Sequence, residues 1–490
     1  MKKEAFADIE REEKLIKSKI QRGRLRAKEW LIKRLDDTDR SSQASDETKK
    51  EHQWELTQLE DLALRTGPND TPIHIVFSTN NCEPDNYWQA YQFFLAALRV
   101  RQPGRITQIA SGCKSDAEKQ AIRDWHAEHI VPLSMRFGLH LTPHFSSEKV
   151  VPYGIKHWME HGKGMGIDPT TELPWKHDTI IALLDADQLL LKPITGYFSS
   201  PDDIFRGGSN VEGGTGDNID MLLSQDNESQ FMVRHGHPLA QEYGLRDIWR
   251  KYAHVAGPDS PAAKVTSNEA MRSYSVGPPY IATALDFYII AANWCEFVPK
   301  IYKEYPQALA TTHAYSIAAA HLSLKHQLMG SLMVSDTATA GGGGDGEGWT
   351  LVDAIPGDKV CAFALNSLDP DEHQLPSSMF FSHRYGVGDK AFFSKKKVPS
   401  NYFSCDSPLL EEPPLDIGSG KYLYKKPPFR DTKVSFSNIP DIAAVIEKRE
   451  AFIVCAATGF LNEGAQFYKN RHCGGKANLK KEINLHDLPE

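Results

Sequence analysis

The stretch "IIALLDADQLLLKPI", residues 180–194, decides the fold. Five apolar residues run directly into Asp185-Ala186-Asp187, and a second apolar run follows at once. Such an uninterrupted apolar run is typical of a strand that is buried on both faces, in the middle of an α/β sheet. The stretch therefore predicts a central strand at 179–184 whose end carries two carboxylates.

Segments of alternating type precede this strand. Residues 73–81 ("IHIVFSTNN") and 105–112 ("RITQIASG") have the character of strands, whereas 88–100 and 153–162 have the spacing of helices. Strands that alternate with helices form βαβ units and a parallel sheet. The sequence therefore predicts an α/β fold.

After about residue 195 the pattern is less regular. Residues 206–218 and 338–348 are glycine-rich but match no phosphate-binding motif, so they are predicted to be surface loops or a lid over a site. Helices are expected at 315–329, which is rich in alanine, and at 440–470. The Gly-x-Gly-x-Gly run at 162–166 follows a helix rather than a strand, so it does not indicate a dinucleotide site.

The first 66 residues differ from the rest of the chain. Apolar residues at helical spacing lie on a heavily charged background, which predicts a helical extension, either a solvated stalk or a helical pair on the domain. Acidic residues are interleaved too evenly for a membrane-surface helix. The expected organisation is this extension at 1–66, one large domain at 72–475 and a tail at 476–490.

Charge and cysteine content exclude several classes of protein. A formal net charge of −8 offers no positive field to nucleic acid. The seven cysteines include no Cys-x-x-Cys pair, so a cysteine zinc site is not expected, and their odd number leaves a free thiol. No membrane-spanning segment or signal peptide is visible, so the sequence as written is typical of a cytosolic protein. Sequons at Asn69 and Asn227 instead hint at a secretory lumen.

The aspartate pair predicts a cation site. If the strand continues, Asp185 and Asp187 point to the same side of it, and hard oxygen ligands suit magnesium or manganese. Such an ion can bridge the phosphates of a nucleotide and neutralise charge on a diphosphate leaving group. Two alternatives remain open: a solvated turn, and a haloacid-dehalogenase-like phosphatase in which Asp185 is the nucleophile.

Six blocks of sequence point to a known family. They resemble, in order, the peptidyl serine α-galactosyltransferase and hydroxyproline O-arabinosyltransferase family of plants and algae. The similarity covers roughly residues 72 to 475. The blocks are "QPGRITQIASGC" (102–113), "VPYGIKHWMEHG" (151–162), "TIIALLDADQLLLKPITGYF" (179–198), "GPPYIATALDFYIIAANWCEFVP" (277–299), "YSIAAAHLSLKHQLMGSLMVS" (315–335) and "KVPSNYFSCDSPLLEEPP" (397–414).

The resemblance implies a GT-A-type nucleotide-sugar domain, an α/β fold with a mixed sheet flanked by helices. The implied reaction moves galactose or arabinofuranose from a UDP-sugar, with Mn²⁺ or Mg²⁺, to serine or hydroxyproline hydroxyls of a glycoprotein, with retention of configuration. Members are usually Golgi or ER proteins that are held in the membrane by an N-terminal anchor. No anchor is visible in this sequence, so a cytoplasmic location is an open alternative.

The resemblance also implies roles for residues on the donor side. Asp187 would bind the metal directly, and Asp185 would share the metal site or contact the sugar or ribose. Ser78 and Thr79, at the end of the first strand, match positions near the uridine. Lys156 would reach the donor phosphates or sugar, or would be a lysine on a helix surface.

Other positions depart from the family or have a structural alternative. Tyr280 would line the acceptor side of the site or pack in the core. Thr311 replaces an acidic residue of the relatives, so His313 is the candidate for a substitute catalytic base. His383 is the candidate for a third metal ligand, although it is displaced by three residues. These departures leave open a catalytically silent relative that binds nucleotide-sugar or glycoprotein.

Overall fold

The chain divides into two units, Met1–Asp70 and Thr71–Glu490, and every described residue belongs to the second. This computed structural model describes residues 73–79, 87–163, 165–166, 179–195, 233–307, 309–337, 348–366, 375–422 and 440–488. The extension expected at 1–66, the glycine-rich stretch 206–218 and nearly all of 338–348 lie outside the described residues.

A seven-stranded mixed sheet forms the centre of the described part. Neighbouring strands β1, β2, β3 and β4 run parallel, whereas β7 pairs with β4 in the antiparallel direction. The predicted α/β fold with a mixed sheet is therefore confirmed. In spatial order the strands are β3 (Phe137–Leu141), β2 (Ile106–Ala110), β1 (Ile73–Thr79), β4 (Ile180–Asp185), β7 (Val276–Thr283), β6 (Leu239–Glu242) and β8 (Gln327–Met329).

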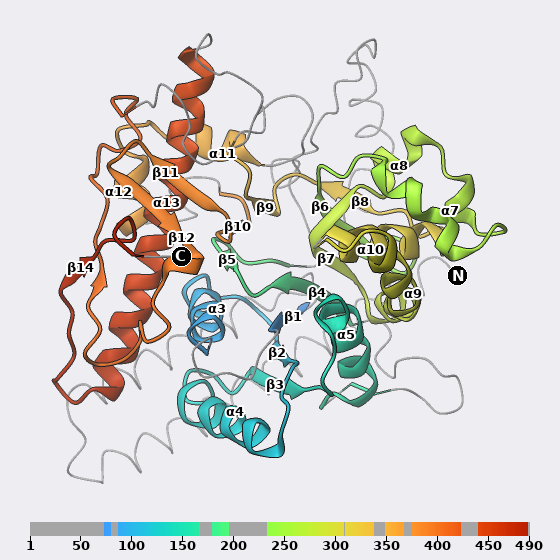
Figure 1. The fold of residues 1–490 in the computed structure, drawn as a ribbon, viewed down its shortest axis with the longest axis horizontal. Coiled ribbons are helices and arrows are strands. Elements are labelled where there is room, and N and C mark those ends of the chain that lie inside the picture. Colours follow the sequence, from blue (N-terminus) through green and yellow to red (C-terminus); the bar gives the residue numbers. More distant parts are fainter. Residues whose placement is uncertain are drawn as a thin grey trace, which may run out of the picture. The chain divides into compact units, whose positions relative to one another are not determined.

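Strand β4 is the middle strand and is buried on both faces, as its apolar run predicts. Ala182 and Leu184 belong to the hydrophobic cluster that includes α3 (Tyr87–Arg99), while Ile181 and Leu183 belong to a second cluster. The second cluster draws on the helices visible on the other side of the sheet in Figure 1, namely α5 (Val150–His161), α9 (Ala284–Glu304) and α10 (Leu309–His321). Alternating side chains of one strand thus join two cores.

The alanine-rich segment is shorter as a helix than the sequence predicts. The expected helix at 315–329 ends at His321, Ser323 adopts a left-handed backbone with φ 57°, and β8 begins at Gln327. The prediction was wrong here because strand pairing outweighs helical spacing: Gln327 to Met329 pair with β6 at the edge of the sheet. The predicted helix at 440–470 is confirmed as α13 (Pro440–His472).

Three small sheets lie outside the seven-stranded sheet. A disulfide joins Cys361 of α12 (Val360–Asn366) to Cys455 of α13, and a second joins Cys405 to Cys473. The strands are β5 (Gln188–Leu190), β9 (Met333–Val334), β10 (Ser378–Phe380), β11 (Arg384–Val387), β12 (Ala391–Ser394), β13 (Leu409–Leu410) and β14 (Lys481–Ile483). The remaining helices are α4 (Asp116–His129), α7 (Pro261–Lys264), α8 (Ser267–Ser273), α11 (Trp349–Asp353), α12 (Val360–Asn366) and the 3₁₀ helices η2 (Ser147–Lys149), η4 (Ile248–Ala256) and η5 (Lys395–Lys397).

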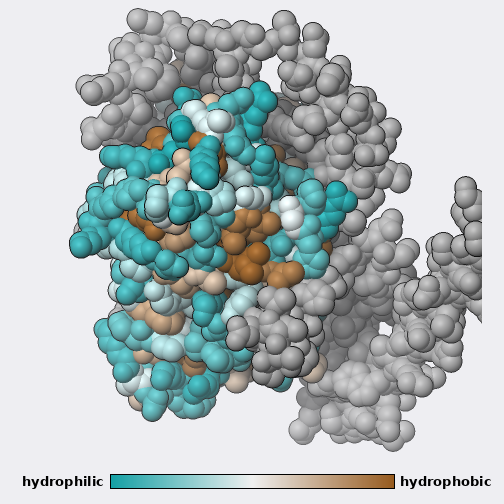
Figure 2. All heavy atoms as spheres, turned by 90° about the vertical axis from the view of Figure 1, so that its right-hand side faces the viewer, coloured by the Kyte–Doolittle hydropathy of each residue, from teal (hydrophilic) through white to brown (hydrophobic). Residues whose placement is uncertain are grey.

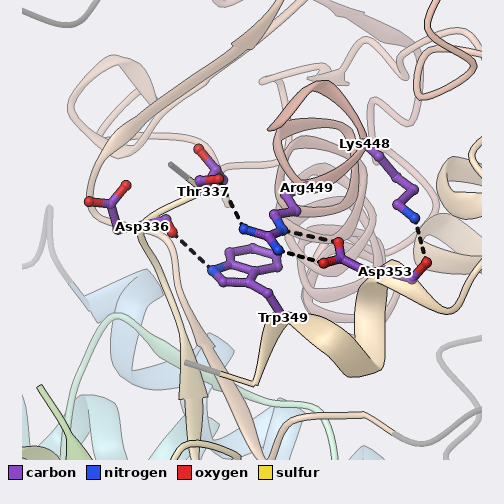
Figure 3. Close-up of polar contacts among 6 residues, drawn as sticks. All are labelled: Asp336, Thr337, Trp349, Asp353, Lys448 and Arg449. Carbon is purple, nitrogen blue, oxygen red and sulfur yellow. Dashed lines mark hydrogen bonds and ion pairs between the residues drawn. The ribbon is translucent and has the colours of Figure 1, made fainter. Parts of the chain in front are cut away.

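A buried arginine fastens α13 to α11. The Arg449 guanidinium donates to both carboxylate oxygens of Asp353, and its carbon lies 5.4 Å from the Trp349 ring centroid (Figure 3). The Trp349 indole in turn donates to the backbone oxygen of Asp336, and Lys448 donates to that of Asp353. Each of these charged groups has a partner, so the cluster is structural.

The face that carries α7 and α8 is mostly hydrophilic, with hydrophobic residues gathered near its centre and smaller hydrophobic spots elsewhere (Figure 2). Among the described residues, none of the helices combines the length and apolar character needed to cross a membrane.

Candidate active site at the end of strand β4

The two aspartates lie in a turn at the carboxyl end of the central strand. Strand β4 ends at Asp185, Ala186 and Asp187 form the turn, and β5 starts at Gln188. The interpretation that one continuous strand runs through both aspartates was wrong, because the strand ends at Asp185 and β5 leaves the main sheet to pair with β10. The turn nevertheless keeps the carboxylates close enough for the charge of Asp187 to act on Asp185.

Gln188 fixes the shape of this turn. Its side-chain oxygen accepts the backbone N–H of Asp185 at 2.9 Å, and its amide donates to the backbone oxygen of Pro278 at 3.2 Å. The side chain is fully buried, so these hydrogen bonds are shielded from water. On the other side of the turn, the backbone N–H of Phe381 donates to the backbone oxygen of Asp187 at 3.1 Å.

The charges at the turn are not balanced. Burial, followed by the charge of Asp187, raises the pKa of Asp185 to about 7, and Lys395 acts in the opposite direction. The Lys395 ammonium lies 3.0 Å from a carboxylate oxygen of Asp187, and the two side chains are 20% and 14% exposed. Two carboxylates therefore share one nearby lysine, which is a setting that favours an additional cation.

The end of β1 brings a hydroxyl to the same edge of the sheet. Ser78 pairs in register with Asp185, and its buried hydroxyl has no hydrogen-bond partner among the described residues. Buried hydroxyl groups are normally hydrogen-bonded, so a polar ligand would satisfy this one. The neighbouring Thr79 already accepts a hydrogen bond from Gln108 at 3.0 Å and is almost fully buried.

Two predicted residues are engaged elsewhere. Lys156, on α5, forms an ion pair with Glu160 at 2.6 Å, an arrangement that residues one helical turn apart commonly adopt. Tyr280, on β7, is 3% exposed and stacks on Tyr315 with ring centroids 3.9 Å apart. Asp185 lies near enough to contribute to the raised pKa of Tyr280, but the ring itself is part of the core.

The two candidate histidines have different surroundings. His313 is buried between Tyr252 and Tyr305, with ring centroids at 5.4 and 5.7 Å, and burial lowers its pKa to about 4. No contact of His313 with the aspartates is present among the described residues. His383 is exposed and follows β10, two residues beyond the backbone contact with Asp187. Its ring lies 5.3 Å from that of Phe380.

The aspartates fit a divalent cation only in part. Their oxygens are the hard ligands that Mg²⁺ and Mn²⁺ prefer. One lysine does not neutralise both carboxylates, and the Ser78 hydroxyl has no hydrogen-bond partner among the described residues, so both could interact with a bound ligand. Where the structure describes the chain, His383 and the two aspartates do not form a group whose donor atoms all lie within 4.8 Å of one another. In the described part, the three potential ligands whose donor atoms all lie within 4.8 Å of one another are Glu128, His129 and His472.

Two residues of this site were not predicted from the sequence. Lys395 is 208 positions from Asp187 and begins a run of three lysines, which in isolation indicates only a solvated surface. Gln188 directly follows the acidic motif, but its role depends on the distant Pro278. The spacing of residues offers no signal for either contact.

Comparison with known proteins adds little to this geometry. No family model matches the sequence, and no curated protein does. One solved structure to which the chain is similar is titled "WbbM bifunctional glycosytransferase apo structure", with 11% identity and a TM-score of 0.26. The match covers 63% of this chain and 53% of that one, so the chain spans about half of its length. A likeness of this size carries no argument about activity.

Proposed function

We propose that the protein is a metal-dependent glycosyltransferase of GT-A type that transfers a sugar from a UDP-sugar to a protein hydroxyl. The observation that supports this most is the position of Asp185, at the carboxyl end of the central strand, in register with Ser78 and beside the charge of Asp187. Ligands of open α/β sheets bind at the carboxyl ends of the strands. The site therefore has the position and the charge expected for a nucleotide diphosphate with its cation.

In this proposal Asp187 and Asp185 hold Mn²⁺ or Mg²⁺ through carboxylate oxygens. When bound, the ion would neutralise the charge that develops on the diphosphate. The surrounding residues prepare the site. Gln188 holds the turn in place, Lys395 neutralises part of the negative charge, and Ser78 offers its hydroxyl to the nucleotide.

The finer assignment of substrates follows the family resemblance of the sequence. It supports galactose or arabinofuranose as the sugar and serine or hydroxyproline of a glycoprotein as the acceptor, with anomeric configuration retained. Tyr280 and His313 take no direct part in this proposal, because both rings are buried in the core.

We infer that the protein works in an oxidising compartment such as the Golgi or ER lumen. Cys361–Cys455 and Cys405–Cys473 are disulfides, and Cys113 is disulfide-bonded as well. Disulfides persist in secretory compartments and are rare in the cytosol. Among the described residues, Cys295 is a free, buried thiol.

Two observations favour a second candidate, a protein that binds nucleotide-sugar without transferring it. The Lys395 ammonium already faces Asp187, and His313 is not placed to act as a base at the aspartates. In such a protein the lysine would take over the neutralising role of the metal ion.

A transfer assay separates the two candidates. The purified chain is incubated with UDP-galactose or UDP-arabinofuranose, Mn²⁺ and a peptide that contains serine and hydroxyproline. The glycosyltransferase proposal predicts a glycosylated peptide or slow release of UDP, lost on addition of EDTA and in Asp187→Asn. UDP-sugar binding without either product supports the silent protein, and absence of binding contradicts both.

A further inference from the structure

A second group of potential metal ligands lies between α4 and the end of α13. Glu128 and His129 close α4, and His472 is the last residue of α13. Each residue offers a donor atom that lies within 4.8 Å of those of the other two. The two histidines are 343 positions apart, so the fold, not local sequence, brings this group together.

The distance between the histidines suits a metal ion. His129 Nδ1 and His472 Nε2 form a hydrogen bond of 3.3 Å, which an ion held by both nitrogens would replace. At a tetrahedral zinc ion with Zn–N bonds of about 2.0–2.1 Å, two nitrogen ligands lie roughly 3.3 Å from each other. The imidazoles therefore already have the spacing of two neighbouring ligands.

Packing against a tyrosine holds both rings in place. Tyr468 packs against both rings, with centroids 5.2 Å from His129 and 4.5 Å from His472. The two histidines are therefore positioned, whereas the Glu128 carboxylate, 3.8 Å from His129 Nε2, has to turn toward the ion.

We propose that Glu128, His129 and His472 form a zinc site that ties α4 to the C-terminal end of α13. Two histidines and one glutamate are the protein ligands of some catalytic zinc sites, where water takes the fourth position. The cysteine pattern gave no reason to expect zinc, and this site uses none of the cysteines. The Cys405–Cys473 disulfide lies directly beyond His472, so the ion would extend an existing covalent anchor of the helix. The site is independent of the aspartates and of the proposed transferase activity.

Zinc titration of the untagged, chelator-treated full chain tests the proposal, with ZnCl₂ as the probe. The wild-type protein should bind zinc at a site that is lost in His129→Ala and in His472→Ala. Glu128→Gln, an exposed substitution that does not perturb packing, should weaken the affinity at least about tenfold, because even changes behind the ligands cost about 10–100-fold. Asp187→Asn serves as the matched control and should retain this zinc.

Thermal unfolding gives a second readout that does not depend on activity. Zinc should raise the midpoint of the wild type and of Asp187→Asn, but not that of His472→Ala, because only an intact site stabilises the folded form by binding. Circular dichroism without zinc establishes that each variant is folded. Retention of the zinc in both histidine variants, or loss of it in Asp187→Asn alone, overturns the proposal.

Discussion

Two regions of the molecule hold charges away from water, and they do so in opposite ways. Around Asp353, the Arg449 guanidinium donates to both carboxylate oxygens, and its side chain is only 2% exposed (Figure 3). Around Asp187, two carboxylates share the Lys395 ammonium, and the nearby Ser78 hydroxyl lacks a partner among the described residues. In the first region each charge has an opposite partner, whereas in the second region the carboxylates and the hydroxyl could still bind a ligand.

This difference separates a charge that holds the fold together from charges that remain able to bind a ligand. A buried ion pair with good geometry resists change because removal of one partner leaves the other uncompensated. Carboxylates that repel each other instead make the folded state less stable until a cation binds. Substitutions in the two regions should therefore affect different properties: stability in the first and ligand binding in the second.

The largest expected effect is the loss of stability in Arg449→Met. The substitution leaves the Asp353 carboxylate without its bidentate partner, which should lower the free energy of unfolding by about 3 kcal/mol. Equilibrium denaturation measures this loss. The double variant Arg449→Met/Asp353→Leu removes both charges and should recover part of it. A loss below about 1 kcal/mol, in the range of surface pairs, would show that the pair is not structural.

The next effect concerns activity. Asp187→Asn should reduce sugar transfer on the order of 100-fold or more, since it removes a ligand of the proposed cation, while the free energy of unfolding stays close to that of the wild type. Kinetics and thermal unfolding are measured on the same preparations. Asp389→Asn, which changes a carboxylate that is 79% exposed, is the matched control and should leave transfer intact. Equal activity of the two variants would contradict the assigned role of Asp187.

A third effect is expected in the pH dependence of stability. The pKa of Asp185 is about 7 in the folded protein and near 3.9 in an unfolded chain, so the folded state binds the proton more tightly. The stabilisation from this proton is complete below about pH 4 and is lost as the pH rises through about 7. The thermal midpoint of the wild type should fall relative to that of Asp185→Asn over this range. A difference that does not vary with pH would contradict the raised pKa of Asp185, which burial and then the charge of Asp187 cause.

The smallest effect is expected from Lys395→Gln. Lys395 lowers the pKa of Asp185, so its removal should shift the pH-dependent step in stability to higher pH. The accompanying change in the free energy of unfolding should be about 1 kcal/mol or less, because the pair is partly exposed. Lys396→Gln, in the same run of lysines, is the control and should leave the step in place. A shift of the same size in both variants would mean that Lys395 has no special role.

The central part of the fold follows from the sequence because its signals are local. The apolar runs of β1, β2 and β4, and the intervening helices α3 and α5, have clear periods and lengths. The edge strand β8 does not, since its three residues continue an alanine-rich segment and become a strand only by pairing with β6. The small C-terminal sheets consist of strands of two to four residues, which carry no periodic signal.

The same distinction between local signals and tertiary packing applies to the candidate site. Asp185 and Ser78 could be placed together from the sequence, because both end parallel strands. The turn at Asp187 could not, since it depends on β5 pairing with β10 nearly 200 positions away. Lys395 and the aromatic surroundings of His313 are likewise set by tertiary packing, which residue spacing does not report.

Calorimetric titration of UDP into the protein, with and without Mn²⁺, tests the role of the aspartates most directly. The wild-type chain should bind UDP in the presence of Mn²⁺ and lose most of this affinity in EDTA, and Asp187→Asn should show weak binding under both conditions. Equally tight binding of UDP with and without the metal, or by Asp187→Asn and the wild type alike, would contradict a cation held between these carboxylates and a diphosphate.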